Sequence, residues 1–194
     1  TTTGVKLGQV TYDNCYRHGV AVVGAVGIEG GRIQPGSDGR LGMCALDIEP
    51  DNDPSTDIYF ESVKGCTVQV APPNASDRCR RIEIGRMDLN PAHSAESSPA
   101  YSAPIREWAL SLRNISDLRI GSFQAEDHDD HAIIHTFNVG EASDQRLFIG
   151  HMRVINVGAG EAVYNSPIVV SNMTYVKIDS MEVELDAVGD YALY

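Results

Sequence analysis

The feature that most constrains this 194-residue chain is a short pattern that returns along most of its length. An isoleucine is followed three residues later by a hydrophobic residue or glycine, and two residues after that by an apolar residue. The copies begin at Ile28, Ile84, Ile120, Ile149 and Ile178, with a degenerate copy at Ile58. Internal repeats of about 20 to 50 residues are typical of proteins in which similar units stack on one another. The pattern therefore predicts a stacked repeat.

A second pattern, a small residue followed by a large apolar one, alternates with the first. Its copies are Ala21-Val22, Ala45-Leu46, Thr67-Val68, Ala109-Leu110, Ala132-Ile133, Ala162-Val163 and Ala192-Leu193. They lie 22 to 30 residues apart, except for one gap of 42 that contains the polar, proline-punctuated segment 90–105, an expected excursion loop. Two interleaved patterns predict an all-β fold, a right-handed parallel β-helix of about seven coils, as a single domain over residues 1–194. An antiparallel sandwich or jelly roll is the alternative, but it gives no reason for two kinds of strand to alternate.

Successive side chains of a strand point to opposite faces, so the residues around each copy of the second pattern divide into two alternating sets, which we call the interior parity and the outward parity. The outward parity carries a file of alanines flanked by carboxylates, hydroxyls and tyrosines. A flat strip of this composition suits a linear sugar chain, because carboxylates accept hydroxyl protons and aromatic rings pack on sugar C–H faces. The substrate-binding residues expected on or beside this strip are Asp47, Glu49, Ser111, His131, His135, Tyr164 and Asp190.

The densest cluster of ionisable groups is Glu126-Asp127-His128-Asp129-Asp130-His131. Glycoside hydrolysis needs two carboxyl groups, roughly 5–5.5 Å apart for retention and roughly 6.5–9.5 Å apart for inversion. Neighbouring strands lie about 4.8 Å apart, so carboxylates on adjacent or alternate coils fall in this range. We therefore expect Glu107, Asp129, Asp130 and Glu161 to act as catalytic acids and bases. The same run also fits a solvated turn or a divalent-cation site, and no other cofactor is expected.

Composition excludes several classes of function. The formal net charge is −12, from 27 acidic and 15 basic residues, and a balance of this kind repels nucleic-acid phosphates. No apolar run approaches 18 residues, so we expect no membrane insertion. The four cysteines lack metal-ligand spacing, and Cys44 and Cys66 are expected to lie on consecutive coils as buried thiols rather than as a disulfide.

Three short segments carry a family resemblance: residues 14–22, Ile28-Glu29-Gly30-Gly31, and Ala45-Leu46-Asp47-Ile48-Glu49-Pro50-Asp51. They resemble coil openings and turns of the pectate-lyase-like β-helix superfamily, which includes phage tailspike, depolymerase and polygalacturonase-related proteins. Asp129-Asp130 is similar to the paired aspartates of the polygalacturonase branch, whereas Gly160-Glu161-Ala162 lacks that branch's histidine. No calcium site or basic residue of the lyase branch is evident on the outward strip, so a hydrolase is favoured over a lyase.

The resemblance implies a protein of the virion surface or extracellular space that binds and depolymerises a polysaccharide or surface glycan. A non-catalytic β-helix adhesin or structural protein of a virion or cell surface is the alternative. Because the sequence given starts without a methionine and stops at Tyr194, inside an expected strand of the second pattern, we expect it to be part of a longer chain. The resemblance to tailspikes also implies a homotrimer.

Overall fold

The computed structural model describes residues 2–13, 18–36, 44–50, 53–72, 79–93, 108–128, 131–136, 145–157, 168–170 and 173–184. Within these ranges the chain is all-β, apart from the short 3-10 helix η1 (Pro91–His93) that follows β8. No described helix has the length and apolar character that crossing a membrane requires.

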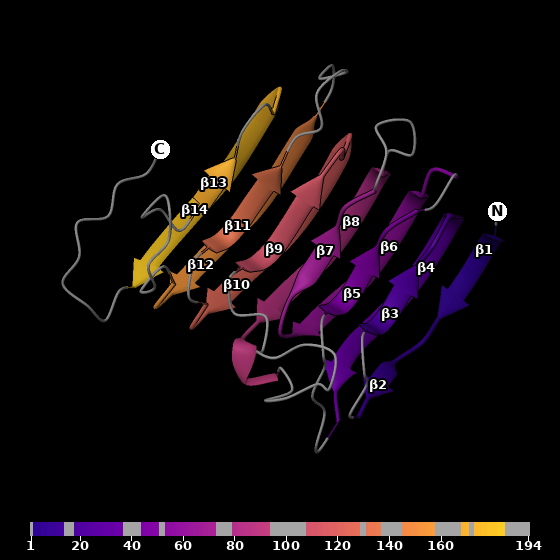
Figure 1. Ribbon diagram of the computed structural model, residues 1–194, viewed down its shortest axis with the longest axis horizontal. Helices are drawn as coiled ribbons and strands as arrows, with labels where there is room; N and C mark the ends of the chain where they lie inside the picture. Colours follow the sequence, from indigo (N-terminus) through magenta and orange to yellow (C-terminus); the bar gives the residue numbers. More distant parts are fainter. Residues whose placement is uncertain are drawn as a thin grey trace.

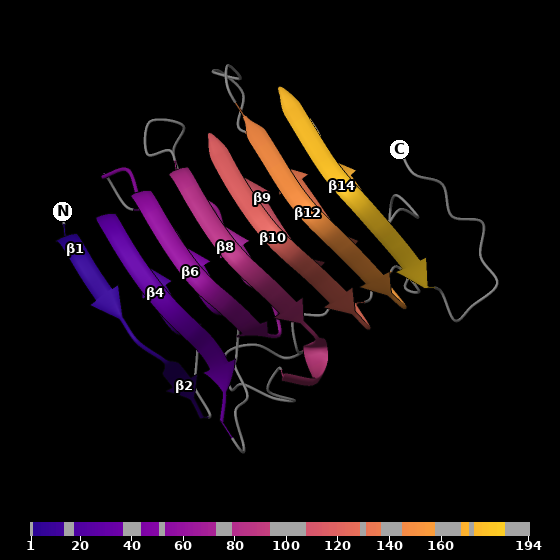
Figure 2. The ribbon, with the colours of Figure 1, turned by 180° about the vertical axis from the view of Figure 1, so that it is seen from behind.

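The described strands form two sheets, and the chain passes repeatedly from one to the other (Figure 1). The eight-stranded sheet, which faces the viewer in Figure 2, contains β1 (Thr2–Leu7), β4 (Ala25–Pro35), β6 (Thr56–Gly65), β8 (Arg80–Leu89), β10 (Asp117–Glu126), β12 (Arg146–Ile155) and β14 (Tyr175–Glu184) in that order, with β2 (Val10–Tyr12) also paired to β4. The six-stranded sheet contains β3 (His18–Val22), β5 (Cys44–Ile48), β7 (Val68–Val70), β9 (Trp108–Arg113), β11 (His131–Thr136) and β13 (Ile168–Val170), which neighbour one another in that order.

Every described pair of neighbouring strands is parallel. The predicted all-β class with parallel strands is confirmed. The antiparallel sandwich, the alternative from the sequence, does not describe these two sheets. Parallel neighbours need a crossover between them, and here each crossover carries a strand of the other sheet.

The first sequence pattern corresponds to one file of residues across the eight-stranded sheet. Ile84, Ile120, Ile149 and Ile178 are register partners on consecutive strands, as predicted. The two early copies are displaced, because Ile28 and Ile58 align with Ile82 rather than with Ile84. A shift of two residues keeps a side chain on the same face of a strand, so the sequence pattern alone could not detect the displacement.

In the first pattern, the three-residue step from the isoleucine to the next hydrophobic residue marks a local break in the alternation of buried and exposed side chains along the strand. Ile84 and Met87 are fully buried, while Gly85 and Arg86 between them both have exposed surface. A Cβ atom on Gly121 would lie 2.5 Å from the carbonyl oxygen of Gly85, and one on Gly150 would lie 2.6 Å from that of Gly121. Glycine at this position therefore lets consecutive strands approach closely at the break.

The second sequence pattern builds the facing file of the six-stranded sheet. Val20, Leu46, Val68, Leu110 and Ile133 are register partners in turn, as the interior parity predicted. The next member is Ile168, not Val163. The pattern missed Ile168 because it requires a small residue before the apolar one, and the residue before Ile168 is Pro167.

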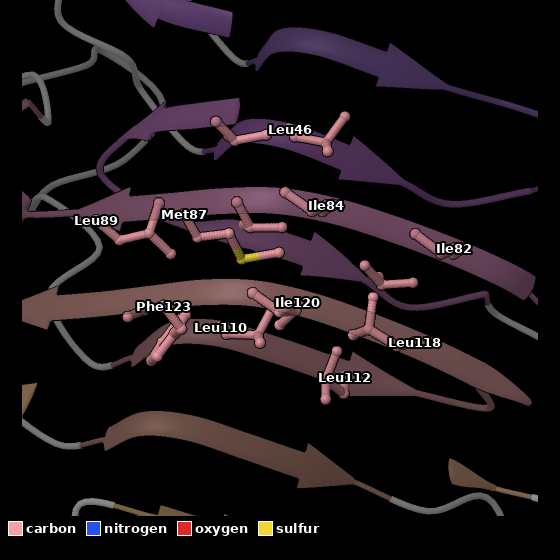
Figure 3. Packing of buried hydrophobic residues seen from close by; sticks show 14 of the residues in the cluster. Leu46, Ile82, Ile84, Met87, Leu89, Leu110, Leu112, Leu118, Ile120 and Phe123 are labelled. Carbon is pink, nitrogen blue, oxygen red and sulfur yellow. The ribbon is translucent and has the colours of Figure 1, made fainter. Parts of the chain in front are cut away.

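The core lies between the two sheets, where the inward files meet (Figure 3). Phe60, Ile84, Leu110 and Phe123 are among the side chains with no exposed surface. Burying a side chain of this size contributes about 1.5–3 kcal/mol to folding. The outward faces of both sheets thus rest on one continuous apolar layer.

Candidate functional site

The four predicted catalytic acids and two of the predicted binding residues lie outside the described residues: Glu107, Asp129, Asp130, Glu161, Tyr164 and Asp190. The observed register nevertheless corrects the alignment on which the expectation for Glu161 was based. That alignment paired Ile133 with Val163, whereas the register partner of Ile133 is Ile168. The spacing of coils therefore gives no reason to place Glu161 beside Asp130.

Two predicted binding residues do share a file on the outward side of the six-stranded sheet. Asp47 pairs with Gln69, and Gln69 pairs with Ser111. Asp47 is only 5% exposed, however, and its carboxylate oxygen lies 3.4 Å from Nε2 of His18. Asp47 is thus part of a buried contact within the protein, while Ser111 and Glu49 are partly exposed.

The two predicted histidines lie in β11. His131 is buried and pairs with Trp108, which excludes it from an open surface. The backbone of His135 pairs with those of Leu112 and Val170.

The expected floor of exposed alanines is not present on β5, β9 and β11. Ala45, Ala109 and Ala132 have no exposed surface. A Cβ atom on Gly65 would lie 2.5 Å from both the Ala45 Cβ and the Tyr12 hydroxyl. Ala45 therefore packs close to the last residues of β2 and β6 in the eight-stranded sheet. Parity sorts side chains within one strand, but it cannot account for a corner where the chain turns between sheets.

The cysteines behave as the sequence predicted. Cys44, Cys66 and Cys79 are buried free thiols. Burial raises the pKa of Cys44 and Cys79 well above the ordinary thiol value, and raises the pKa of Cys66 to about 11. Protonated thiols are poor nucleophiles, so these three side chains are structural. Cys15 lies outside the described residues.

An open depression of about 460 Å³ lies on the outward face of the eight-stranded sheet, over β4, β6 and β8. Arg32, Ser62 and Arg86 are register partners across these three strands. The short serine stands between two long arginines, and this difference in length hollows the surface. Ile33 and Val63, buried beneath, form part of its lining. We call this site the arginine–serine depression.

Ion pairs hold the polar side chains of the arginine–serine depression in place. Nε and Nη2 of Arg32 donate hydrogen bonds of 3.0 and 2.9 Å to Oε1 of Glu61, which raises the pKa of Arg32. Lys64 and Arg86 both face the Asp88 carboxylate, at 3.9 and 3.7 Å. These two separations exceed direct hydrogen-bond distance, so both cations have donors to offer a ligand.

The chemistry of this depression is that of a polar binding site. Guanidinium groups donate in a planar fork to carboxylates and to hydroxyl oxygens, while Glu61 and Asp88 accept from hydroxyls. Among the described residues, no group of three or more His, Cys, Asp or Glu side chains is placed to hold a metal ion. These groups can exchange hydrogen bonds with a polar ligand.

Sequence reasoning missed this site because its residues come from three strands, and residues on different strands are 22 to 56 positions apart in the chain. A local signal existed: Arg32 and Arg86 each directly follow the glycine at the break in their strand. Aligning the breaks rather than the leading isoleucines would have placed both arginines in one file. No protein-family model matches this chain, and neither a curated protein nor a solved structure matches it.

Proposed function

We propose that this chain is a right-handed parallel β-helix of about seven coils that binds a polysaccharide or surface glycan on the outward face of its eight-stranded sheet. Two observations support the β-helix: strands alternate between two sheets, and residues 24 to 36 positions apart become register partners. Because it resembles tailspike-related proteins, we propose that it functions in the extracellular space or on a virion surface.

The arginine–serine depression is the single observation that carries the binding proposal. It is open, it lies on a sheet continuous over eight described strands, and its lining mixes three cations with two carboxylates and a hydroxyl. The depression carries one more cation than carboxylate on a chain whose net charge is −12. A sugar chain lying on the sheet can exchange hydrogen bonds with both kinds of group.

Affinity electrophoresis tests this proposal. The protein is run through native gels containing dextran, xylan, alginate, hyaluronan or polygalacturonate. At least one polysaccharide is expected to retard it, and Arg86→Ala is expected to weaken that interaction about tenfold, the loss of one charged hydrogen bond. Arg113→Ala, an arginine change on the six-stranded sheet, is the matched control and is expected to bind like the wild type. Unretarded migration of the wild type in every gel would refute the proposal.

Hydrolysis of the bound glycan is a second candidate function. Trp108 and His131 are register partners on neighbouring strands. In the sequence, Glu107 directly precedes Trp108 and Asp130 directly precedes His131. We propose that Glu107 and Asp130, with Asp129, supply the acid and base. A reducing-end assay on the polysaccharide panel tests this: the wild type is expected to release reducing ends and Asp130→Asn is not. Absence of release by the wild type from a polysaccharide that it binds would leave the non-catalytic adhesin.

A further inference from the structure

A second exposed feature on the same sheet face is a small aromatic group. The rings of Phe148 on β12 and Tyr175 on β14 lie 5.3 Å apart between centroids, tilted by 40°. The guanidinium carbon of Arg119, on β10, lies 4.4 Å from the centre of the Phe148 ring. We call these three residues the aromatic ledge.

Strand register and one shared carboxylate position the side chains of the aromatic ledge. Arg119 and Phe148 are register partners, and so are Arg146 and Tyr175. Asp117 lies 3.6 Å from Nε of Arg119 and 3.4 Å from Nη2 of Arg146, so one carboxylate anchors both arginines. A cation over a ring face adds about 0.5–1 kcal/mol at an exposed site. This contact favours the observed orientation of the Phe148 ring.

Tyr175 is the more exposed of the two rings in the ledge. It is 47% exposed, although it leans on Phe148. A tyrosine presents an apolar ring and a polar hydroxyl, and such side chains are favoured where a ligand has both kinds of surface. The C–H face of a sugar ring, bordered by hydroxyls, has this character.

The ledge and the arginine–serine depression lie on one continuous sheet face. β8 carries Arg86, and β10, β12 and β14 follow it in the sheet. Ser180 on β14 is in register with Arg86 through Ser122 and His151, and Tyr175 lies five residues before Ser180. With strands about 4.8 Å apart and about 3.3 Å per residue, Tyr175 lies about 14 Å from Arg86 across the strands and about 16 Å along them. An oligosaccharide running diagonally over this face can reach both places.

We infer that the aromatic ledge is a second subsite for the same glycan, in which a sugar ring stacks on Tyr175. This inference rests on the proposed glycan binding and adds an extended, strand-crossing binding mode to it. Stacking of this kind contributes about 0.5–1.5 kcal/mol, or roughly two- to tenfold in affinity. Removing the ring should therefore weaken binding without abolishing it.

The test uses the panel polysaccharide that retards the wild type most strongly in affinity gels. Tyr175→Ala is expected to raise the dissociation constant about three- to tenfold, and Tyr175→Phe, which keeps the ring, is expected to stay within about twofold of the wild type. Val23→Ala is the control, because Val23 is an exposed apolar residue that directly follows β3 of the six-stranded sheet, away from the ledge and the depression. Melting temperatures of all variants exclude loss of folding as the cause.

Two failures are distinguishable. If Arg86→Ala weakens binding and Tyr175→Ala does not, the ledge is not a subsite, while glycan binding at the depression stands. The ledge is likewise not a subsite if Val23→Ala weakens binding as much as Tyr175→Ala. If no polysaccharide retards the wild type, the proposed function itself fails, and the ledge proposal is overturned with it.

Discussion

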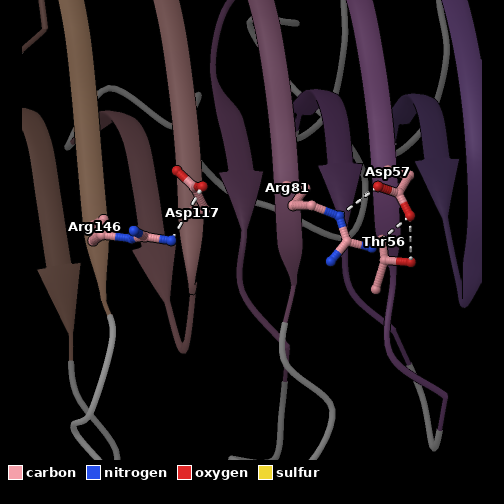
Figure 4. Close-up of polar contacts among 5 residues, drawn as sticks. All are labelled: Thr56, Asp57, Arg81, Asp117 and Arg146. Carbon is pink, nitrogen blue, oxygen red and sulfur yellow. Dashed lines mark hydrogen bonds and ion pairs between the residues drawn. The ribbon is translucent and has the colours of Figure 1, made fainter.

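Asp57 on β6 and Arg81 on β8 occupy the same position on neighbouring strands, and both have left-handed backbone, with φ of 58° and 51° (Figure 4). Nε and Nη2 of Arg81 donate hydrogen bonds of 2.5 and 2.6 Å to the two carboxylate oxygens of Asp57. Asp117 and Arg146 form the corresponding pair on β10 and β12. Near the starts of β6, β8, β10 and β12, acidic and basic side chains thus alternate from one strand to the next: Asp57, Arg81, Asp117 and Arg146.

The Asp57–Arg81 pair predicts a pH-dependent contribution to stability. Hydrogen bonding to Arg81 lowers the pKa of Asp57 below its ordinary value of 3.8. A depressed pKa in the folded state means that the pair stabilises the protein above the ordinary pKa, and that this contribution is lost as pH falls through the folded-state pKa. We expect Arg81→Ala to be less stable than the wild type near neutral pH, by a small amount because both side chains are exposed.

Urea unfolding from neutral to acidic pH measures this difference. The gap between wild type and Arg81→Ala is expected to close as Asp57 becomes protonated. A gap that stays constant down to about pH 2 would show that the carboxylate does not titrate as described.

The glycine at the strand break predicts a sharp difference between two alanine substitutions. Gly121→Ala places a methyl group against the Gly85 carbonyl oxygen, so we expect a loss of about 1–3 kcal/mol in unfolding free energy. Gly8→Ala is the control, because a Cβ atom there would meet nothing within 4 Å. Equal stability of the two variants in chemical denaturation would contradict the close approach of consecutive strands.

Asn114 predicts a preference for glycine over alanine at one buried turn. Its backbone has a φ of 49°, and its side chain donates a hydrogen bond of 3.4 Å to the Pro72 carbonyl. Both substitutions remove the hydrogen bond, but only alanine also meets the left-handed penalty of about 1–2 kcal/mol. We expect Asn114→Gly to unfold at higher denaturant concentration than Asn114→Ala, and the reverse order would contradict the assigned backbone.

The buried thiols predict resistance to thiol reagents. In a Cys15→Ser background, Cys44, Cys66 and Cys79 are the remaining cysteines, and all three are buried with a raised pKa. We expect Ellman's reagent to detect no thiol in the native protein and all three after denaturation. Rapid reaction of a native thiol would mean that the sheet packing is looser than described.

The sequence carries enough information for the parallel stacking and for much of the core. Ile84, Ile120 and Ile149 can be placed in one file because hydrophobic residues recur at the same distance from each strand break. The displacement of Ile28 is hidden because a two-residue slip on a strand leaves the same face inward. Ile168 escapes detection because the pattern that locates its file requires a small residue before it.

The candidate site is less accessible to sequence reasoning. Parity correctly puts Asp47 and Ser111 in one outward file, but it gives no measure of what covers that file, and Asp47 is buried. The arginine–serine depression depends on lateral neighbours from three strands, which requires the register of each pair to be known. Side-chain length across strands, rather than along one, decides where the surface is hollow.

An NMR titration of arginine side-chain Nε–Hε signals with the bound polysaccharide tests the central claim most directly, because it reports where the glycan lies. We predict that the signals of Arg32 and Arg86 shift with added polysaccharide, while that of Arg113 on the six-stranded sheet does not. Shifts confined to Arg113, with Arg32 and Arg86 unchanged at saturation, would contradict binding on the eight-stranded sheet.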